Sequence, residues 1–152
     1  MIRFLLPLTL ALLPVAAQAL EPKKPSQLVT LVPSGTCQSD DGFLYGNRVN
    51  PDGSFSSFTI PPKQVLVVTR WAFTFTGGAG TAGTVAALAT SDATSALARV
   101  YFPFDADGSG GGATELSAVV GEGEVLCGFH VSGLQTIAPF DGFIEGFLTK
   151  AK

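Results

Sequence analysis

One run of residues, 64–76, constrains the fold more than any other part of this chain. Apolar side chains recur along it at every second position, and successive side chains of a strand point to opposite faces of a sheet. The odd-numbered residues share one face, which we predict to be core: Val65, Val67, Thr69, Trp71, Phe73 and Phe75. The other face carries Leu66, Val68, Arg70, Ala72 and Thr74. Because Leu66 and Val68 are strongly apolar, we expect a second layer or a second copy of the chain to cover this face too.

Similar short runs recur along the rest of the chain, separated by glycine and proline. The sequence Asn50-Pro51-Asp52-Gly53 is a strong turn signal, since proline fixes φ and Asp-Gly forms tight corners. The segment Thr84–Thr90 is rich in alanine, but it is short and has no helix cap, so we favour a strand. Eight to nine such strands without a convincing amphipathic helix predict an all-β fold. We favour an antiparallel β-sandwich that is jelly-roll-like, and a barrel is the alternative.

The first 19 residues have the features of a secretory signal peptide. Arg3 precedes an almost wholly apolar segment, and Ala17-Gln18-Ala19 matches a signal-peptidase site. A membrane anchor is the alternative, but the apolar segment is shorter than the roughly 20 residues that span a bilayer. We therefore predict a signal peptide at residues 1–19, an extended N-terminal arm at 20–27 and a single β-sandwich domain at 28–152. The expected location is secreted or periplasmic, with no membrane span after signal removal.

The charge distribution argues against nucleic acid as a partner. The net charge is −3, and Lys and Arg form no cluster. Binding to nucleic acid or to an anionic membrane requires a basic surface. Charged residues make up only 14% of the chain, which suits surfaces that are buried against copies of the same chain. A homo-oligomer is therefore one expected assembly.

The two cysteines, Cys37 and Cys127, are predicted to form a disulfide bond. A chain sent to an oxidising compartment generally pairs an even number of cysteines. The bond would join an early loop to a late strand. A catalytic thiol would need a nearby histidine, and a metal site would need more ligands; neither is evident in the sequence.

The segment that begins at Asp105 is the best candidate for a metal site. Asp105, Asp107 and Ser109 stand at the first, third and fifth positions before a glycine, as oxygen ligands do at the start of a calcium loop. The twelfth position should be a bidentate glutamate, but it is Leu116, and Glu115 comes one residue early. Aspartate and glycine are also common in turns, so a plain turn is favoured and no other cofactor is indicated.

No motif in the sequence indicates catalysis. His130 is the single histidine, and neither Gly-x-Ser-x-Gly nor His-Glu-x-x-His occurs. The acid pairs Asp40/Asp41 and Glu122/Glu124 could serve glycoside cleavage, but they stand in turn-like segments that do not fix their separation. We therefore predict that the chain is not an enzyme, and a glycoside or ester hydrolase ranks last.

Three side chains are candidates for ligand binding: Tyr101, Arg99 and Tyr45. An aromatic ring offers a face on which a sugar can stack, and Arg99 and Tyr101 share one face of a predicted strand. Trp71 is in phase with the apolar face of its strand and is assigned to the core. Jelly-roll folds often bind glycans, but that link rests on the fold alone.

The segment Phe58-Thr59-Ile60-Pro61-Pro62-Lys63-Gln64-Val65-Leu66 resembles one that opens a long strand in small exported bacterial β-sandwich proteins. Arg99-Val100-Tyr101 and Gly146-Phe147-Leu148 resemble segments that recur with it. The resemblance covers roughly the last two thirds of the chain and implies a β-sandwich. It transfers no functional residue, because those proteins are largely of unknown function.

The expected function is that of a secreted, non-enzymatic β-sandwich protein with a structural or binding role, self-assembly included. A carbohydrate-binding module with a glycan as partner is the alternative. The two can be separated by whether the even-numbered face of residues 64–76 meets solvent, a sugar or another copy.

Overall fold

A computed structural model of the chain describes residues 22, 24–37, 42–75, 84–90, 96–102, 109–131 and 140–151. These residues form one short 3-10 helix and nine strands, and the predicted all-β antiparallel fold of eight to nine strands is confirmed. The elements are η1 (Pro25–Gln27), β1 (Leu28–Thr36), β2 (Gly42–Val49), β3 (Phe55–Ser57), β4 (Gln64–Phe75), β5 (Thr84–Thr90), β6 (Ala96–Phe102), β7 (Gly110–Val120), β8 (Leu126–Val131) and β9 (Phe140–Lys150).

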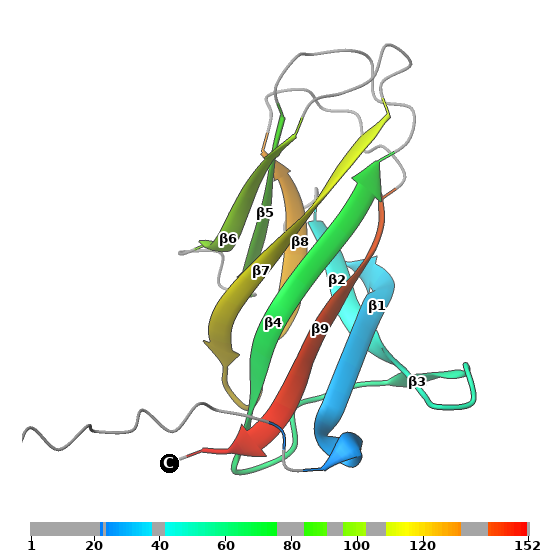
Figure 1. Ribbon diagram of the computed structural model, residues 1–152, viewed down its shortest axis with the longest axis vertical. Coiled ribbons are helices and arrows are strands. Elements are labelled where there is room, and N and C mark those ends of the chain that lie inside the picture. Colours follow the sequence, from blue (N-terminus) through cyan, green and yellow to red (C-terminus); the bar gives the residue numbers. More distant parts are fainter. Residues whose placement is uncertain are drawn as a thin grey trace, which may run out of the picture.

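The strands form one antiparallel sheet in the order β6-β5-β8-β2-β1-β9-β4-β7, and the short β3 pairs with β2 (Figure 1). With β3 set aside, the pairing is nested: β1 pairs with β9, β2 with β8, β4 with β7 and β5 with β6. A chain that folds back on itself as one long hairpin and is then rolled up has this pattern. It is the pattern of a jelly roll, as the sequence predicted.

The rolled sheet has a front half, β1-β9-β4-β7, and a back half, β6-β5-β8-β2, which face each other (Figure 1). On one side, β1 pairs with β2 and joins the two halves. On the other side, the terminal strands β6 and β7 approach each other, since a Cβ added at Gly112 would lie 3.0 Å from Cγ1 of Val100. The two halves therefore enclose a single core.

The core draws side chains from both halves. Trp71 on β4 and Leu88 on β5 are among its largest fully buried residues. Nε1 of Trp71 donates a hydrogen bond of 2.8 Å to the hydroxyl of Tyr45 on β2, and the ring centroids of Trp71 and Phe73 are 4.6 Å apart. The hydrogen bond satisfies the one polar atom of the buried indole and connects the front half to the back half.

Strand β4 changes phase at Thr69, which corrects the predicted core face. A register shift separates Val68 from Arg70 in the pairing of β4 with both β7 and β9. Before the shift Leu66 and Val68 belong to the core, and after it Trp71 does. An extra residue in one strand is a β-bulge, and it reverses the alternation of side chains beyond it. The Thr69 hydroxyl donates a hydrogen bond of 3.2 Å to the carbonyl of Glu145, which helps to hold the bulge.

This change of phase explains why both faces of the run are apolar in the sequence. Leu66 and Val68 are core residues, so no additional layer or second copy is needed to cover them. The residues opposite Leu66 on the two neighbouring strands, Val120 and Leu148, are also buried. The prediction was wrong in placing Val65, Val67 and Thr69 on one face with Trp71, although Val67 is itself buried, at 3% exposure.

Substitutions at two adjacent positions test this assignment. Leu66→Ala removes a side chain that is 1% exposed, and it should lower the free energy of unfolding by about 2–5 kcal/mol. Val65→Ala, at a half-buried position outside the core cluster, should cost about 1 kcal/mol or less. Chemical denaturation of the two variants measures the difference, and equal losses would contradict the phase change.

The predicted disulfide bond between Cys37 and Cys127 is present. Cys37 directly follows β1 in the front half, and Cys127 lies on β8 in the back half. The bond closes a loop across a sequence separation of 90, and in the chain-entropy account such a loop contributes about 4–5 kcal/mol. It thus adds a covalent link between the two halves to the hydrogen bond from Trp71 to Tyr45.

The arm expected to be extended at residues 20–27 ends instead in the 3-10 helix η1. The side chain of Gln27 explains this turn: its Oε1 accepts a hydrogen bond of 2.8 Å from the amide of Lys24, and its Nε2 donates one of 2.9 Å to the carbonyl of Leu148. Pro25 suits the first position of a helical turn, where no N–H is required. Residues 1–21, which include the predicted signal peptide, lie outside the described residues.

Candidate ligand-binding groove

The outer surface of the front half has a shallow groove of about 500 Å³. Pairing across β9, β4 and β7 arranges the outward side chains in rows, and two adjacent rows form the groove. One row holds Phe143, Ala72 and Ala113, and the next holds Asp141, Thr74 and Gly111. The lining consists of Val32, Ala72, Phe73, Thr74, Gly111, Gly112, Asp141, Gly142 and Phe143. We call this site the outer groove.

Small residues create the hollow. Gly111 is exposed on β7, where exposed and half-buried positions alternate. A Cβ at this position would lie 2.6 Å from the carbonyl oxygen of Phe73, so glycine allows an approach of the two strands that other residues would prevent. Ala72 on β4 contributes only a methyl group. The missing side-chain volume at these positions leaves a depression in the outer surface, between positions where larger side chains cover the backbone of the sheet.

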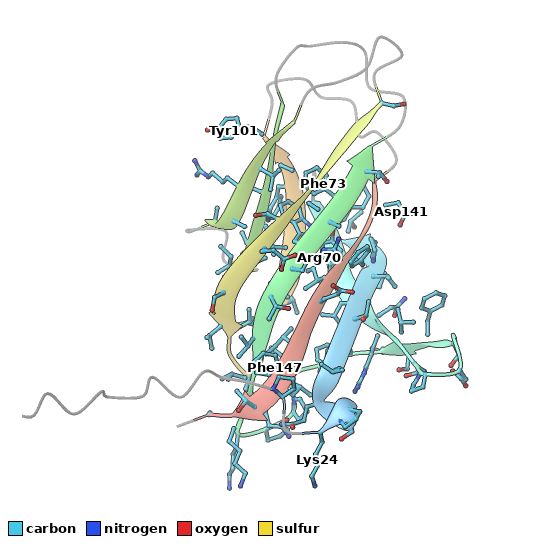
Figure 2. The ribbon with its side chains drawn as sticks, in the orientation of Figure 1. Lys24, Arg70, Phe73, Tyr101, Asp141 and Phe147 are labelled. Atoms are coloured by element: carbon cyan, nitrogen blue, oxygen red, sulfur yellow. A yellow bond between two sulfur atoms is a disulfide. The ribbon has the colours of Figure 1, made fainter. Side chains whose placement is uncertain are left out.

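Polar groups stand at one end of the outer groove. Asp141 is exposed and lies opposite Thr74 in the pairing of β9 with β4 (Figure 2). Its Oδ1 accepts a hydrogen bond of 2.7 Å from the amide of Gly142, which orients the carboxylate. An ionised carboxylate offers about four acceptor positions, so this bond leaves capacity for the donors of a ligand.

Arg70 lies one row from Phe143 on the side away from Asp141, near the middle of the front half (Figure 2). Its Nε is 3.6 Å from Oε1 of Glu115, and its Nη1 is 3.5 Å from Oε2 of Glu145. The guanidinium carbon is 5.5 Å from the centre of the Phe143 ring, within cation–π range. Exposed ion pairs contribute only about 0–1 kcal/mol each to stability, so their main effect is to position Arg70 beside Phe143.

The predicted ligand-binding residues Arg99 and Tyr101 lie on the terminal strand β6 of the back half. Both are exposed, and Tyr101, which is 77% exposed, projects away from the sheet (Figure 2). The outer groove is on the front half, so the structure does not bring these residues into it. Ligand binding by this pair stays a prediction.

Tyr45, the third predicted binding residue, is a core residue, which corrects its expected role as a stacking surface. It is only 2% exposed, and its hydroxyl accepts the hydrogen bond from Trp71. Burial raises the pKa of the Tyr45 hydroxyl well above its usual value; the Trp71 hydrogen bond opposes the shift, and the charge of Asp141 adds to it. A ring with so little exposure cannot serve as a surface platform for a sugar.

Replacement of Tyr45 by phenylalanine should lower stability in a pH-dependent way. Trp71 would lose its buried acceptor, which should cost about 1–3 kcal/mol at neutral pH. In the wild type, the unfolded tyrosine releases its proton above about pH 10 while the folded one keeps it, so the contribution of Tyr45 is complete below that pH and declines above it. Denaturation curves in neutral and alkaline buffer should therefore show the gap between the two proteins narrowing above about pH 10. A gap that stays constant would contradict the raised pKa.

The candidate calcium loop falls largely outside the described residues. This holds for Asp105 and Asp107, whereas Ser109 directly precedes β7. Within the described part of the chain, no group of three or more His, Cys, Asp or Glu side chains could hold a metal ion. The same part contains no helix long and apolar enough to cross a membrane. Calcium binding at Asp105, Asp107 and Ser109 stays a prediction.

Glu122 and Glu124, one of the acid pairs considered for hydrolysis, hold the backbone of turns. A carboxylate oxygen of Glu122 accepts a hydrogen bond of 3.0 Å from the amide of Lys63. The Glu124 carboxylate accepts one from an amide within the turn between β7 and β8. The other candidates, Asp40/Asp41 and the side chain of His130, lie outside the described part of the structure.

Comparison with known proteins does not place the chain in a family. No protein-family model matches it, and no curated protein matches it. The resemblance to small exported bacterial β-sandwich proteins stays a prediction. The function of the outer groove is therefore argued from its own geometry.

The residues of the outer groove were not selected from the sequence. Asp141 and Phe143 flank a glycine at the start of the last strand, and Gly111 belongs to a run of three glycines directly after the candidate calcium ligand Ser109. The sequence signal for the groove is a small residue at an outward position of neighbouring strands, such as Ala72 on β4 and Gly111 on β7. That signal becomes useful only once it is known that β7 and β9 both pair with β4, which the order of the chain does not reveal.

Proposed function

We propose that the chain is a non-enzymatic binding module that acts outside the cytoplasm, with the outer groove as its binding site. The observation that carries the proposal is the groove itself: a hollow of about 500 Å³ beside an aromatic side chain, with a carboxylate and a hydroxyl at one end. Sites for small molecules typically have volumes of about 300–1,000 Å³ and combine apolar walls with a few polar groups.

A neutral saccharide is the ligand class that best fits these groups. A sugar ring has apolar C–H faces and hydroxyl groups around its edge, so it needs an apolar wall and hydrogen-bonding partners at once. Phe143 and Val32 supply apolar wall, Asp141 accepts hydrogen bonds, and Thr74 can both donate and accept. Hydrogen bonds to an ionised carboxylate are stronger than those between neutral groups, and the negative charge of Asp141 disfavours anionic sugars.

Two features support a location outside the cytoplasm. The Cys37–Cys127 disulfide is of the kind that persists in oxidising compartments. Residues 1–19 carry the charged start, apolar segment and small-residue site of a signal peptide. A secreted or periplasmic protein would meet free saccharides and cell-surface glycans.

A glycan array, followed by calorimetric titration of the neutral glycan that binds best, tests the proposal. Phe143→Ala should weaken binding by about tenfold or more, because the aromatic wall is lost, and Asp141→Asn should weaken it by about threefold or more. Melting curves should show that both variants remain folded, since both positions lie on the outer surface.

Tyr101→Ala is the matched control, because it removes an exposed aromatic ring from the opposite half of the fold. It should leave the affinity unchanged. A blank array would overturn the proposal. Loss of binding in Tyr101→Ala but not in Phe143→Ala would move the site to β6.

Self-association is a second candidate function, supported by an apolar row across the outer surface of the front half. Pairing places Leu28, Phe147, Val67 and Val119 in this row, of which Phe147 (labelled in Figure 2) and Val67 are buried, at 5% and 3% exposure. Leu28 and Val119, at its two ends, are 54% and 55% exposed. A contact between copies would remove these side chains from water. Light scattering should then show a mass that rises with concentration and that Val119→Asp reduces, whereas a strict monomer at high concentration would exclude this candidate.

A further inference from the structure

Strand β2 changes partner along its length, and this opens a fork in the back half. Residues Gly42 to Leu44 pair with β8, whereas Asn47 to Val49 pair with β3. Between these two segments, the carbonyl of Gly46 accepts a hydrogen bond of 2.8 Å from the amide of Phe58, just after β3. The chain that leads from β3 to β4 therefore diverges from the beginning of β8.

A cavity of about 450 Å³ lies in this fork, and we call it the fork cavity. Its apolar lining includes Leu44, Tyr45, Phe58, Ile60, Leu66 and Leu126. Tyr45, Ile60, Leu66 and Leu126 are members of the core cluster and at most 7% exposed, so they form the floor of the cavity. Its rim is formed by the turn before β8, where Val125 is 41% exposed.

The size and lining of the fork cavity suit an organic ligand. Protein interiors are close-packed, with few voids larger than one water molecule. The lining combines the apolar side chains with the polar residues Ser34, Asn47, Ser57 and Thr59, so a ligand that enters would replace water there. The volume of about 450 Å³ lies in the range of about 300–1,000 Å³ that is typical of small-molecule sites.

The charge at the rim restricts the ligand further. Glu124 is the one charged residue that lines the fork cavity within the described part of the chain, and it is acidic. Its carboxylate accepts a hydrogen bond from the amide of Gly121, which holds it at the turn. A ligand with its own carboxylate, such as a fatty acid, would meet a like charge there.

We propose that the fork cavity is a binding site for a mainly apolar small molecule without negative charge, whose ring system or short alkyl chain lies against the floor that Tyr45 and Leu66 help to form. The polar end of the ligand remains at the rim beside Glu124. This site is separate from the outer groove and does not depend on saccharide binding.

Titration of the disulfide-intact protein with 1-aminoanthracene tests this proposal. This neutral tricyclic amine matches the cavity in size and absorbs in the range where tryptophan emits. Trp71, the single tryptophan of the chain, is hydrogen-bonded to Tyr45 in the cavity lining, so bound dye should quench its fluorescence by energy transfer. Saturable quenching is the expected result. Anthracene-1-carboxylate, with the same rings and a negative charge, should bind about tenfold more weakly.

Variants at the rim distinguish this cavity from other sites. Val125→Phe should narrow the entrance and weaken dye binding by about tenfold, whereas Val119→Phe, the same change at an exposed valine on the outer surface, should not. Glu124→Lys should reverse the preference and favour the carboxylate dye. It gives an independent test should Val125→Phe fail to fold.

Absence of saturable quenching in the wild type, or equal affinity in Val125→Phe and the wild type, would overturn the proposal. Equal affinities of the two dyes would overturn its charge requirement. Phe143→Ala should leave dye binding unchanged, so loss of the dye in that variant would assign it to the outer groove instead. A blank glycan array with normal dye binding would refute only the saccharide proposal.

Discussion

The bulge at Thr69, where β4 has one residue more than β9 and one fewer than β7, decides how the longest strand of the sheet divides between core and surface. Without it, the alternation that buries Trp71 would turn Leu66 and Val68 outward into water. With it, both apolar stretches face the core, and Arg70 turns outward between Glu115 and Glu145. β-Bulges redirect side chains in this way because one added residue reverses the period-two pattern beyond it.

Two links then hold the halves of the jelly roll together. The hydrogen bond from Trp71 to Tyr45 crosses the core, and the Cys37–Cys127 disulfide connects the end of β1 to β8. The first satisfies a buried donor that would otherwise cost about 1–3 kcal/mol, and the second restricts the unfolded chain. Both proposed binding sites therefore lie on a fold that these two links stabilise. This matters for function, because a site that is already in place costs less to order when a ligand binds.

The two inferred sites differ because they arise from different departures from a regular sheet. The outer groove exists where side chains are missing from outward positions, at Gly111 and Ala72, so it is open and has polar groups at its edge. The fork cavity exists where β2 exchanges one partner strand for another, so it leads inward and is lined by Leu66 and other core side chains. The open outer groove suits a ligand that keeps much of its contact with water, whereas the fork cavity suits a ligand that buries more of its surface.

The sequence by itself determined the class of the fold, the turns and the disulfide. Alternating apolar positions, glycine and proline at the corners, and two cysteines are local or compositional signals, and they are readable without knowing which strands pair. Arg99 and Tyr101 were likewise placed correctly on the exposed face of their strand.

Only the tertiary structure decided the core face before Thr69, the burial of Tyr45 and the composition of the outer groove. Each of these depends on pairing between distant strands. The pairing of β4 with β7 and β9 sets the register on both sides of Thr69, and the folding of β2 over the core brings Tyr45 to Trp71. Residues near 72, 111 and 142 meet only when β4 has paired with β7 and β9. Such pairing depends on how the whole chain packs, and no local pattern in the sequence encodes it.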